Sequence, residues 1–307
     1  MNKKILSIGE IIWDVYPDKK TIGGAPLNFA AHAVLCGAES FLISAIGLDE
    51  LGENALCELS KFGVDCKFIK KNEKPTGQCI VTLDEKRIPH YNVLSDVAYD
   101  YICLEESDYG KINQENFDAL YFGTLIQRNL TSRNAIFNLI KKCHFQNVIC
   151  DVNLRPNCYD EESVNFCLNH ATILKVSMEE EPLLRSFGGY TPKNDTPQSI
   201  AVALCEKYLQ LETVILTLGK DGSYAYIAKD QKEYRQDSIG EKVVSTVGAG
   251  DSFTAAWLVA YLNKESMKLC MKKAAEVSGF VVAHTAAVPF YCGQDFDNDT
   301  ILKRSCL

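Results

Sequence analysis

Several patterns that mark familiar protein classes are missing from this 307-residue chain. Its longest apolar stretch, at residues 253–262, has about half of the ~20 residues that a membrane-spanning helix needs. No two of its 13 cysteines have the C-x-x-C spacing of zinc and thioredoxin-type sites. The motifs G-x-x-x-x-G-K-S/T, H-E-x-x-H and G-x-S-x-G are absent as well. These absences argue against a membrane span, a P-loop, a zinc protease and a serine hydrolase of those types.

Positive charge is also in short supply. Lys and Arg number 32 against 40 Asp and Glu, so the net charge is −8. Such a chain has no electrostatic footprint for nucleic acid or an anionic membrane, and we expect neither as a partner. No signal peptide is recognisable, because Glu10 and Asp14 interrupt the first apolar run. Because the cysteines show no disulfide framework, the expected location is the cytoplasm, with reduced thiols.

What the chain does contain is an alternation of short apolar runs and amphipathic segments. The runs that predict strands are at residues 4–9, 41–46, 147–152, 171–176 and 213–218. The segments that predict helices are at residues 28–35, 53–62, 130–142, 198–209 and 252–262. Continuous apolar strands suit a sheet covered on both faces. The pattern therefore predicts an α/β fold with a doubly wound, mostly parallel sheet flanked by helices.

Two segments depart from this alternation. Residues 76–100 alternate apolar and polar positions around a charged turn, and residues 11–22 contain a Pro-Asp turn. Both patterns are typical of short paired strands. We expect one domain over residues 1–307, with a small accessory sheet formed by about 11–22 and 76–100. This sheet is either a lid over a site or a structural extension of the main sheet.

The segment STVGAGDSFTAAW at residues 245–257 is the strongest candidate for chemistry. Gly248, Ala249 and Gly250 come just before a predicted helix, whose free N–H groups and dipole favour an anion. Asp251 is well placed there to take a proton from an attacking hydroxyl beside bound phosphate. A glycine-rich turn with an Asp helix cap explains the same residues without any function.

A second candidate is IGGAPLNFAAHAVLCG at residues 22–37. Its glycines indicate a tight loop before a helix that starts near Pro26. Asn28 would lie on the first turn, where its amide offers donors and an acceptor to sugar hydroxyls. The alternative is a plain turn followed by a helix, and His32 is expected to be a packed helix residue.

Three further segments follow predicted strands, where parallel sheets bind ligands. In DVNLRP, Asp151 and Asn153 share a face and Arg155 can reach an anion, although a helix cap with a surface ion pair fits equally well. In KVSMEEE at residues 175–181, one of three glutamates suits hydrated Mg²⁺. TLGKDGS at residues 217–223 is either a phosphate loop or a plain hairpin.

Taken together, GGAPLNFA, DVNLR, K-x-S-x-x-E and TVGAGDSF resemble the ribokinase-like (PfkB) carbohydrate kinases in order and separation, over essentially the whole chain. Within that family the chain is most similar to bacterial fructokinases, because of GEIIWDVYPD near the start and VAYDYI at residues 97–102. The resemblance implies a ribokinase-like fold with a β-sheet lid, often used for homodimerisation. It also implies Mg²⁺-assisted transfer of the γ-phosphoryl group of ATP to a sugar hydroxymethyl group.

The resemblance further implies a role for each matching residue. The residues it places in catalysis are Asp251 as the base, Gly248, Ala249 and Gly250 as the anion hole, and Arg155 near the phosphates. Those that would hold the sugar are Asp14, Gly24, Asn28, Asp151, Asn153 and Gln127, with Tyr91 and Arg128 as further candidates for selecting it. Those near the nucleotide are Ser177, Thr217, Gly219, Gly222, Val244 and Ser278. Glu180 corresponds to the magnesium-linked glutamate, acting through water.

The chain departs from the family pattern at Ser245, Ser177 and residues 284–289. Ser245 replaces an Asp often tied to a monovalent cation, so the need for K⁺ is left open. Ser177 replaces a common Asn near the metal, and the HTAAVP stretch lacks a Gly near the nucleotide. D-fructose is the leading acceptor. The alternatives are ribose, 2-keto-3-deoxygluconate or a nucleoside on the same fold, or a sugar-binding regulator without turnover.

Overall fold

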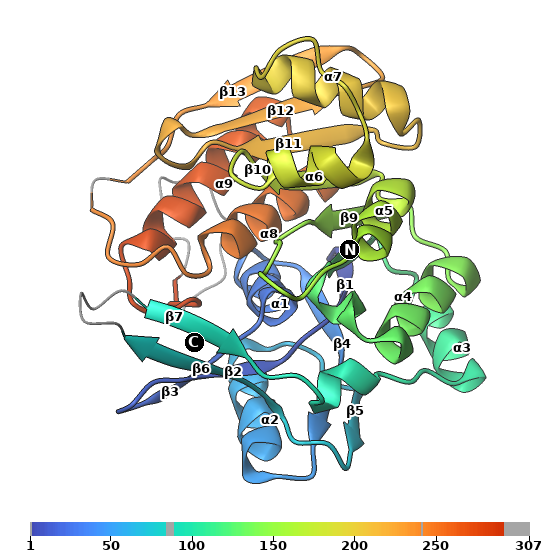
Figure 1. The fold of residues 1–307 in the computed structure, drawn as a ribbon, viewed down its shortest axis with the longest axis vertical. Helices are drawn as coiled ribbons and strands as arrows, with labels where there is room; N and C mark the ends of the chain where they lie inside the picture. The colour runs from blue at the N-terminus through green and yellow to red at the C-terminus, as the bar shows by residue number, and fades with distance from the viewer. Residues whose placement is uncertain (1, 84–88, 241, 292–307) are drawn as a thin grey trace.

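The computed structural model describes residues 2–83, 89–240 and 242–291, and two β-sheets organise them (Figure 1). The larger sheet has nine strands. Their spatial order is β13 (Lys232–Gln236), β12 (Ser223–Ile227), β11 (Thr213–Thr217), β10 (Ile173–Ser177), β9 (Asn147–Asp151), β8 (Ala119–Gly123), β1 (Lys4–Ile8), β4 (Glu39–Gly47) and β5 (Ile69–Asn72). The strands from β11 to β5 are parallel to one another, whereas β12 and β13 are antiparallel additions.

Helices cover both faces of this sheet (Figure 1). One face packs against α3 (Glu106–Glu115), α4 (Leu130–Lys142), α5 (Glu161–His170), α6 (Glu181–Gly188) and α7 (Pro197–Lys207). The other face packs against α1 (Ala25–Leu35), α2 (Glu50–Phe62), α8 (Ala249–Leu262) and α9 (Met267–Val282). Short 3₁₀ turns lie at η1 (Ala98–Tyr101), η2 (Leu125–Arg128) and η3 (Gly219–Asp221). The three-layer α/β arrangement confirms the predicted fold class.

Alternation along the strands explains why both faces need covering. In β1, Leu6 and Ile8 enter the core with α3–α7, while Ile5 enters the core with α1, α8 and α9. In β8, Phe122 and Tyr121 divide in the same way. Burying each such side chain is worth about 1.5–3 kcal/mol, so the two cores hold the carboxyl ends of neighbouring strands in fixed register.

The second sheet has four strands, in the order β3 (Lys20–Gly23), β2 (Ile12–Val15), β6 (Gly77–Leu83) and β7 (Pro89–Val93). Two hairpins meet in it through the parallel pair β2–β6. This arrangement confirms a small separate sheet from the two predicted segments. Residues 84–88 of the second segment lie outside the described residues, and its end forms η1 instead of a strand.

The predicted elements occur close to their expected bounds, with informative differences. The helix expected at 252–262 begins at Ala249, so Asp251 lies inside its first turn and not ahead of it. The elements not expected from the sequence are the strands β5, β8, β12 and β13 and the helices α3, α5, α6 and α9. In the parts of the chain that the structure describes, no helix has both the length and the apolar character to cross a membrane.

Candidate active site

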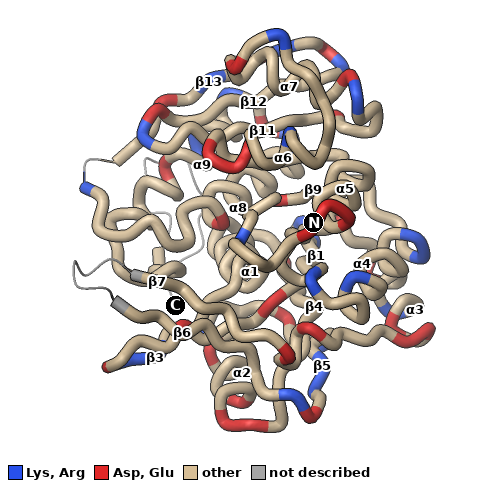
Figure 2. The backbone as a smooth tube through the Cα atoms, viewed as in Figure 1, with Lys and Arg blue, Asp and Glu red and all other residues tan. Residues whose placement is uncertain are grey.

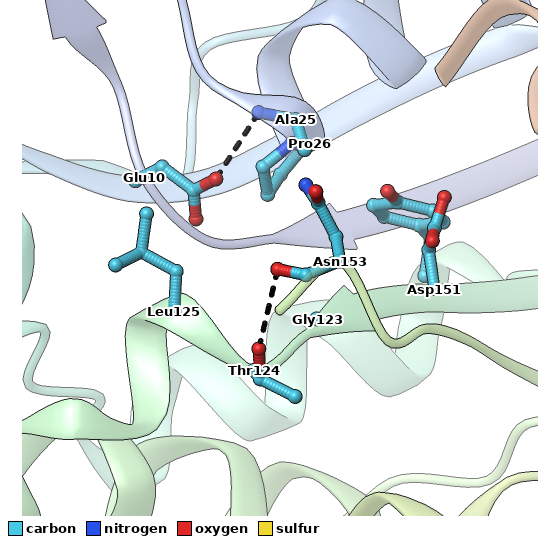
Figure 3. A pocket seen from close by; sticks show the side chains of 9 residues that line it. Glu10, Ala25, Pro26, Gly123, Thr124, Leu125, Asp151 and Asn153 are labelled. Atoms are coloured by element: carbon cyan, nitrogen blue, oxygen red, sulfur yellow. Dashed lines mark hydrogen bonds between the residues drawn. The ribbon is translucent and has the colours of Figure 1, made fainter. Parts of the chain in front are cut away.

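The carboxyl ends of neighbouring parallel strands meet at one edge of the large sheet. From central β1 the chain first builds β4 and β5 on one side, then crosses to β8 and β9 on the other. Ligands bind at such switch points in open α/β sheets. A pocket lies here, and its lining includes Glu10, Pro26, Thr124, Asp151 and Asn153 (Figure 3). The loops after β1, β8 and β9 and the start of α1 therefore converge on one site.

Asp251 and Asn28 form a buried pair that does not line the pocket itself but lies on the first turns of α8 and α1, and Pro26 of that same turn of α1 is in the lining. Asn28 Nδ2 donates a hydrogen bond of 2.8 Å to Asp251 Oδ2, which joins the first turns of α1 and α8. Burial, helped by the charge of Asp151, raises the pKa of Asp251 to about 6, against the opposing hydrogen bond from Asn28. Asn28 Oδ1 is buried and has no hydrogen-bond partner among the described residues. A hydroxyl donor from a ligand would satisfy it.

The first turn of α8 depends on two glycines. Gly248 caps the helix with φ +81°, and a Cβ there would lie 2.4 Å from the carbonyl oxygen of Ala287. His32 holds that same carbonyl at 2.9 Å through Nε2 and is fully buried, as expected for a packed helix residue. A Cβ at Gly250 would lie 2.9 Å from Nζ of Lys175. These contacts fix a turn in which the N–H of Ala249 donates to the carbonyl oxygen of Thr246 at 3.3 Å, while the N–H groups of Gly250 and Asp251 can face an anion.

Asp151 and Lys175 form a buried ion pair beneath this turn. Lys175 Nζ lies 3.0 Å from Asp151 Oδ1, and the side chains are 8% and 1% exposed. The hydroxyl of Thr254 lies 3.3 Å from Asp151 Oδ2. Burial alone would lower the pKa of Lys175, but the carboxylates of Asp151, Glu180 and Asp251 together raise it. Lys175 is therefore held in its charged form.

Glu180 connects the loop after β9 to the end of β10. Its Oε1 accepts from the backbone N–H of Leu154 at 2.7 Å, and its Oε2 accepts from the N–H of Ser177 at 2.9 Å and from its hydroxyl at 2.7 Å. Oε2 already accepts two hydrogen bonds, whereas Oε1 accepts one and keeps acceptor capacity for water. Among the described residues, no group of three or more His, Cys, Asp or Glu could hold a metal ion. This donor set suits a hydrated metal held partly by a ligand's phosphates.

Glu10 was missed by sequence reasoning, although a charge placed directly after a buried strand was a usable signal. It is buried and accepts a 3.1 Å hydrogen bond from the N–H of Ala25, the first residue of α1 (Figure 3). Burial raises its pKa to about 7. Gly24, at φ +110°, packs so closely that a Cβ would lie 2.5 Å from the carbonyl oxygen of Glu10. Glu10 thus fixes the loop that leads to Asn28.

Arg155 and Asp14 lie on the open side of the site. Burial raises the pKa of Asp14 to about 6, and the charge of Arg155 opposes that rise. Arg155 opposes the raised pKa of Glu10 and Asp251 in the same way. Its side chain is exposed and makes no hydrogen bond or ion pair within the described ranges 2–83, 89–240 and 242–291. The guanidinium is therefore available to an anionic group of a ligand.

The predicted nucleotide-side residues fall into two groups. Ser177 and Thr217 are neighbours in register at the carboxyl ends of β10 and β11. Gly219 and Gly222 turn the chain from β11 into antiparallel β12, so this segment is a hairpin. A Cβ at Gly222 would lie 2.0 Å from the carbonyl oxygen of Gln236, which explains that glycine structurally.

The second group lies at the end of α9. The N–H of Val244 donates to the carbonyl oxygen of Val282 at 2.7 Å, which brings the segment before α8 against the helix that carries Ser278. Val244 is 46% exposed, with Val243 and Val247 exposed nearby in sequence. This apolar surface follows the loop that leads to Gly248.

Gln127 lies outside the lining of the pocket, although its buried Oε1 has no hydrogen-bond partner among the described residues, so its expected role at the sugar stays a prediction. Its side chain is fully buried, and Nε2 donates to the carbonyl oxygen of Gly123 at 2.9 Å and to Cys167 Sγ at 3.2 Å. Arg128 is likewise committed, through a bidentate pair with Asp100 at 2.8 and 2.9 Å. Both residues lie on η2, whose side chains hold loops together and offer few donors to a ligand.

Charged residues elsewhere do not gather by sign. Figure 2 shows Lys and Arg interspersed with Asp and Glu along the outer helices and loops. The charged groups that distinguish the site are the buried carboxyls of Glu10, Asp151 and Asp251.

Comparison with known proteins gives matches over nearly the whole chain. The model of the pfkB family carbohydrate kinases matches residues 2–290. PH1459 of Pyrococcus horikoshii, an uncharacterized sugar kinase, is 31% identical over 86% of this chain and 84% of its own length. Its crystal structure with ATP matches with a TM-score of 0.72, at 28% identity over 91% of each chain.

Two further curated relatives have different printed activities. ATP-dependent 6-phosphofructokinase of Thermoanaerobacterium thermosaccharolyticum is 28% identical over 92% of this chain and 89% of its own length. Probable fructokinase-5 of Arabidopsis thaliana is 28% identical over 83% and 82%. The relatives agree on the class of reaction and differ in the acceptor.

Proposed function

Because the chain belongs to the pfkB family of carbohydrate kinases, we propose that it transfers the γ-phosphoryl group of ATP to a sugar hydroxymethyl group, with D-fructose as the leading acceptor. The observation that carries the proposal is the carboxylate of Asp251, buried in the first turn of α8 and held by Asn28. A carboxyl with a pKa of about 6 is ionised at neutral pH and still basic enough to take a proton.

In the proposed step, Asp251 accepts the proton of the acceptor hydroxyl while that oxygen forms a bond to the γ-phosphorus. The bond from the γ-phosphorus to the β,γ-bridging oxygen breaks, and ADP leaves with the electron pair. Such transfers depend on positioning and charge stabilisation more than on covalent chemistry. The N–H groups of the turn at Gly248, Ala249 and Gly250 would stabilise charge on the moving phosphoryl group.

The nucleotide is proposed to lie along the ends of β10 and β11 and the start of α8. Ser177 and Thr217 offer hydroxyls there, and the turn at Gly219 brings backbone close to them. The exposed apolar surface at Val244, next to the helix that carries Ser278, suits a flat aromatic base. The ATP complex of PH1459 supports this nucleotide for the shared fold.

Glu180 is the residue proposed to hold Mg²⁺, through water. When bound, the ion would neutralise phosphate charge. Ser177, in place of the longer Asn, already bonds to Glu180 and fixes its carboxylate. The position of Ser245 leaves a K⁺ requirement to experiment.

The acceptor is proposed to be an uncharged sugar. The site presents the carboxyl groups of Glu10, Asp14 and Asp251, and these suit hydroxyl groups, while a phosphate on the acceptor would face them at close range. Arg155 is the countercharge beside them, and we assign it to the transferring phosphate. Two further residues belong to this proposed sugar site. Gly24 allows the backbone to approach the carbonyl oxygen of Glu10 closely, and Asn153 lines the pocket.

The four-stranded sheet is proposed to act as a lid that excludes water and as a homodimer interface. Its outer strands, β3 and β7, each have one unpaired edge within the described part of the sheet, and a second copy would cover such edges. Light scattering that shows a monomer at micromolar concentration would refute the dimer. A cytoplasmic setting fits the 11 described cysteines, all of which are free thiols.

The test is ADP release with Mg-ATP against fructose, fructose 6-phosphate, ribose, glucose, 2-keto-3-deoxygluconate and adenosine, with and without K⁺. We expect kcat/KM for fructose to exceed every rival at least tenfold, about 1.4 kcal/mol of transition-state preference. If another acceptor has the highest kcat/KM, the proposed role of Asp251 as the base stands and only the assigned acceptor changes. Sugar binding without turnover by any acceptor would replace the kinase with a silent regulator.

A further inference from the structure

Lys175 has a position that the proposed roles leave unexplained. It lies on β10, in a strand that is otherwise apolar apart from Ser177 at its end, and its side chain is 8% exposed. Its Nζ pairs with Asp151 and lies 2.9 Å from the place where a Cβ of Gly250 would be. A buried ammonium at the first turn of α8 is therefore close to the residues of the proposed chemistry without belonging to any of the roles assigned above.

Asp151, the partner of Lys175, connects this lysine to the helix that carries Asp251. The hydroxyl of Thr254 lies 3.3 Å from Asp151 Oδ2, and Thr254 is three residues after Asp251, on the same face of α8. Two buried carboxyl groups therefore lie along one helix face. Like charges at such range oppose each other's ionisation, and Lys175 is the cation that pairs with the second of them.

Several other groups also act on Asp251, and each comes from a different element. They are Asn28 on α1, Glu10 after β1, Tyr121 on β8, Arg155 after β9, and the pair Asp151 and Lys175 on β9 and β10. Arg155 is exposed, so water screens its charge, whereas Lys175 is enclosed and its charge is not screened. Lys175 is thus the fixed cation of the set.

We propose that Lys175 is a positioning residue for phosphoryl transfer. Its ammonium neutralises the charge of Asp151 beside the first turn of α8, so that this charge does not prevent Asp251 from ionising and acting as the base. This inference rests on the proposed function. No new bond is involved, since Lys175 acts only through charge and through its contact with Asp151. The direction of its effect on the pKa of Asp251, which it lowers while Asp151 raises it, is the one this arrangement requires.

A requirement follows for Gly250. Because Nζ of Lys175 lies only 2.9 Å from where a Cβ at that residue would be, a side chain there would require the ammonium to shift from its place beside Asp151. The glycine of the predicted anion hole therefore serves two purposes: it leaves the backbone open to phosphate, and it admits the cation.

The experiment compares the pH profile of kcat/KM for the wild type, Lys175→Gln, Lys175→Arg and Asp151→Asn. Gln keeps an N–H donor for Asp151 and removes the charge, which favours a folded variant. We expect its acidic limb to move up by about one pH unit, with a loss of about tenfold at pH 5 that largely recovers at pH 8.5. In Lys175→Arg the acidic limb of the pH profile should stay at the wild-type pH, because the charge is kept. In Asp151→Asn the acidic limb should move to lower pH, because the charge that opposes ionisation of Asp251 is removed.

Lys70→Met is the matched control. Lys70 on β5 also pairs with a largely buried aspartate, Asp108, at 2.7 Å, at the far edge of the sheet. Its profile should superpose on that of the wild type. A loss of activity in Lys175→Gln that is equal at pH 5 and pH 8.5 would indicate a merely structural lysine and overturn the inference.

A measurement without turnover separates this inference from the proposed function. In protein carrying ¹³C at the aspartate carboxyls, the resonance that disappears in Asp251→Asn reports Asp251. We expect its titration midpoint to rise in Lys175→Gln and to stay in place in Lys70→Met. An unchanged midpoint in Lys175→Gln refutes the role of Lys175, even if the enzyme is active. Absence of turnover in the wild type refutes only the kinase.

Discussion

Asn28 Nδ2 donates a 2.8 Å hydrogen bond to Asp251 Oδ2, across 223 residues of sequence. The bond joins the helix that follows the first strand to the helix that carries the proposed base. It uses one donor of the Asn28 amide, while Oδ1 of the same amide is buried without a partner among the described residues. In the proposed reaction, this one side chain would orient the base and accept a hydrogen bond from the acceptor hydroxyl.

Replacing Asn28 with Ala should therefore affect both partners. A hydrogen bond to a charged group is worth roughly 1.5–3 kcal/mol, so we expect kcat/KM to fall by about 10–100-fold at pH 7. The acceptor KM should rise, and the pKa of Asp251 should rise as well because its ionised form loses a donor. Asn113→Ala, which removes an exposed side-chain bond to the Lys142 carbonyl, is the control. Steady-state kinetics that matched the wild type would remove Asn28 from the site.

The pH dependence of the wild type follows from Asp251. Its pKa is raised to about 6 by burial, and a general base must be ionised to work. We expect kcat/KM to be level above pH 7 and to fall about tenfold for each pH unit well below 6. Circular dichroism over the same range checks that the protein stays folded. A profile that remains level down to pH 4.5 contradicts Asp251 as the base.

The same pKa predicts a trade between stability and activity. Because the folded pKa of about 6 lies above the model-peptide value of 3.8, folding favours the protonated form. The stability that Asp251 contributes is fully present below pH 3.8 and is lost as the pH rises through 6. Asp251→Asn escapes this loss, so at pH 8 it should be more stable by up to about 3 kcal/mol. The advantage should vanish near pH 4, and turnover should fall by 10²–10⁴-fold.

Urea unfolding at the two pH values measures this difference. Glu58→Gln, at a surface ion pair with Lys61 on α2, serves as the control and should change the unfolding free energy little at either pH. An Asp251→Asn variant that is less stable than the wild type at pH 8 would show that the carboxylate is net stabilising, against the expectation.

Gly248 offers a test of the anion hole. Its φ of +81° strains any side chain, and a Cβ would lie 2.4 Å from the Ala287 carbonyl oxygen, so Gly248→Ala must displace one of the two segments. We expect a large loss of kcat. Gly63, at φ +75° with its nearest contact at 3.5 Å, shares the strain without the clash. Gly63→Ala should lower the unfolding free energy by about 1–2 kcal/mol, the cost of a side chain in the left-handed region, and leave kcat unchanged. Equal kcat in both variants would argue against the turn at Gly248 as the anion hole.

Much of this arrangement could be predicted from the sequence, because local patterns determine it. Apolar runs predicted five of the seven parallel strands and missed β5 and β8, and the segment that carries Asp251 predicted a helix where α8 lies. What the local pattern lacked was the extent of that helix: small residues at 248–250 look like a loop, yet Gly248 serves as its left-handed cap. The weak propensity of glycine for helix hid the first turn.

The residues that sequence reasoning missed are those whose role depends on distant partners. Glu10 and Lys175 are charged residues beside or within apolar strands, and nothing nearby shows that Ala25 and Asp151 would satisfy them. Gln127 shows the same dependence on distant partners. Its Nε2 donates to Sγ of Cys167, 40 residues later, while its Oε1 is buried without a partner among the described residues. Polar satisfaction is a property of the folded chain and leaves little trace in local composition.

The parallel seam between β2 and β6 sets an order of events during folding. Residues 12–15 pair with residues 77–80, and the chain between these two strands contains β3, α1, β4, α2 and β5. Closing so long a loop is favourable only after those elements have packed, since their packing shortens the effective distance between the two strands. The small sheet should therefore assemble after the main core, and refolding should restore the packed helices before it restores the proposed lid.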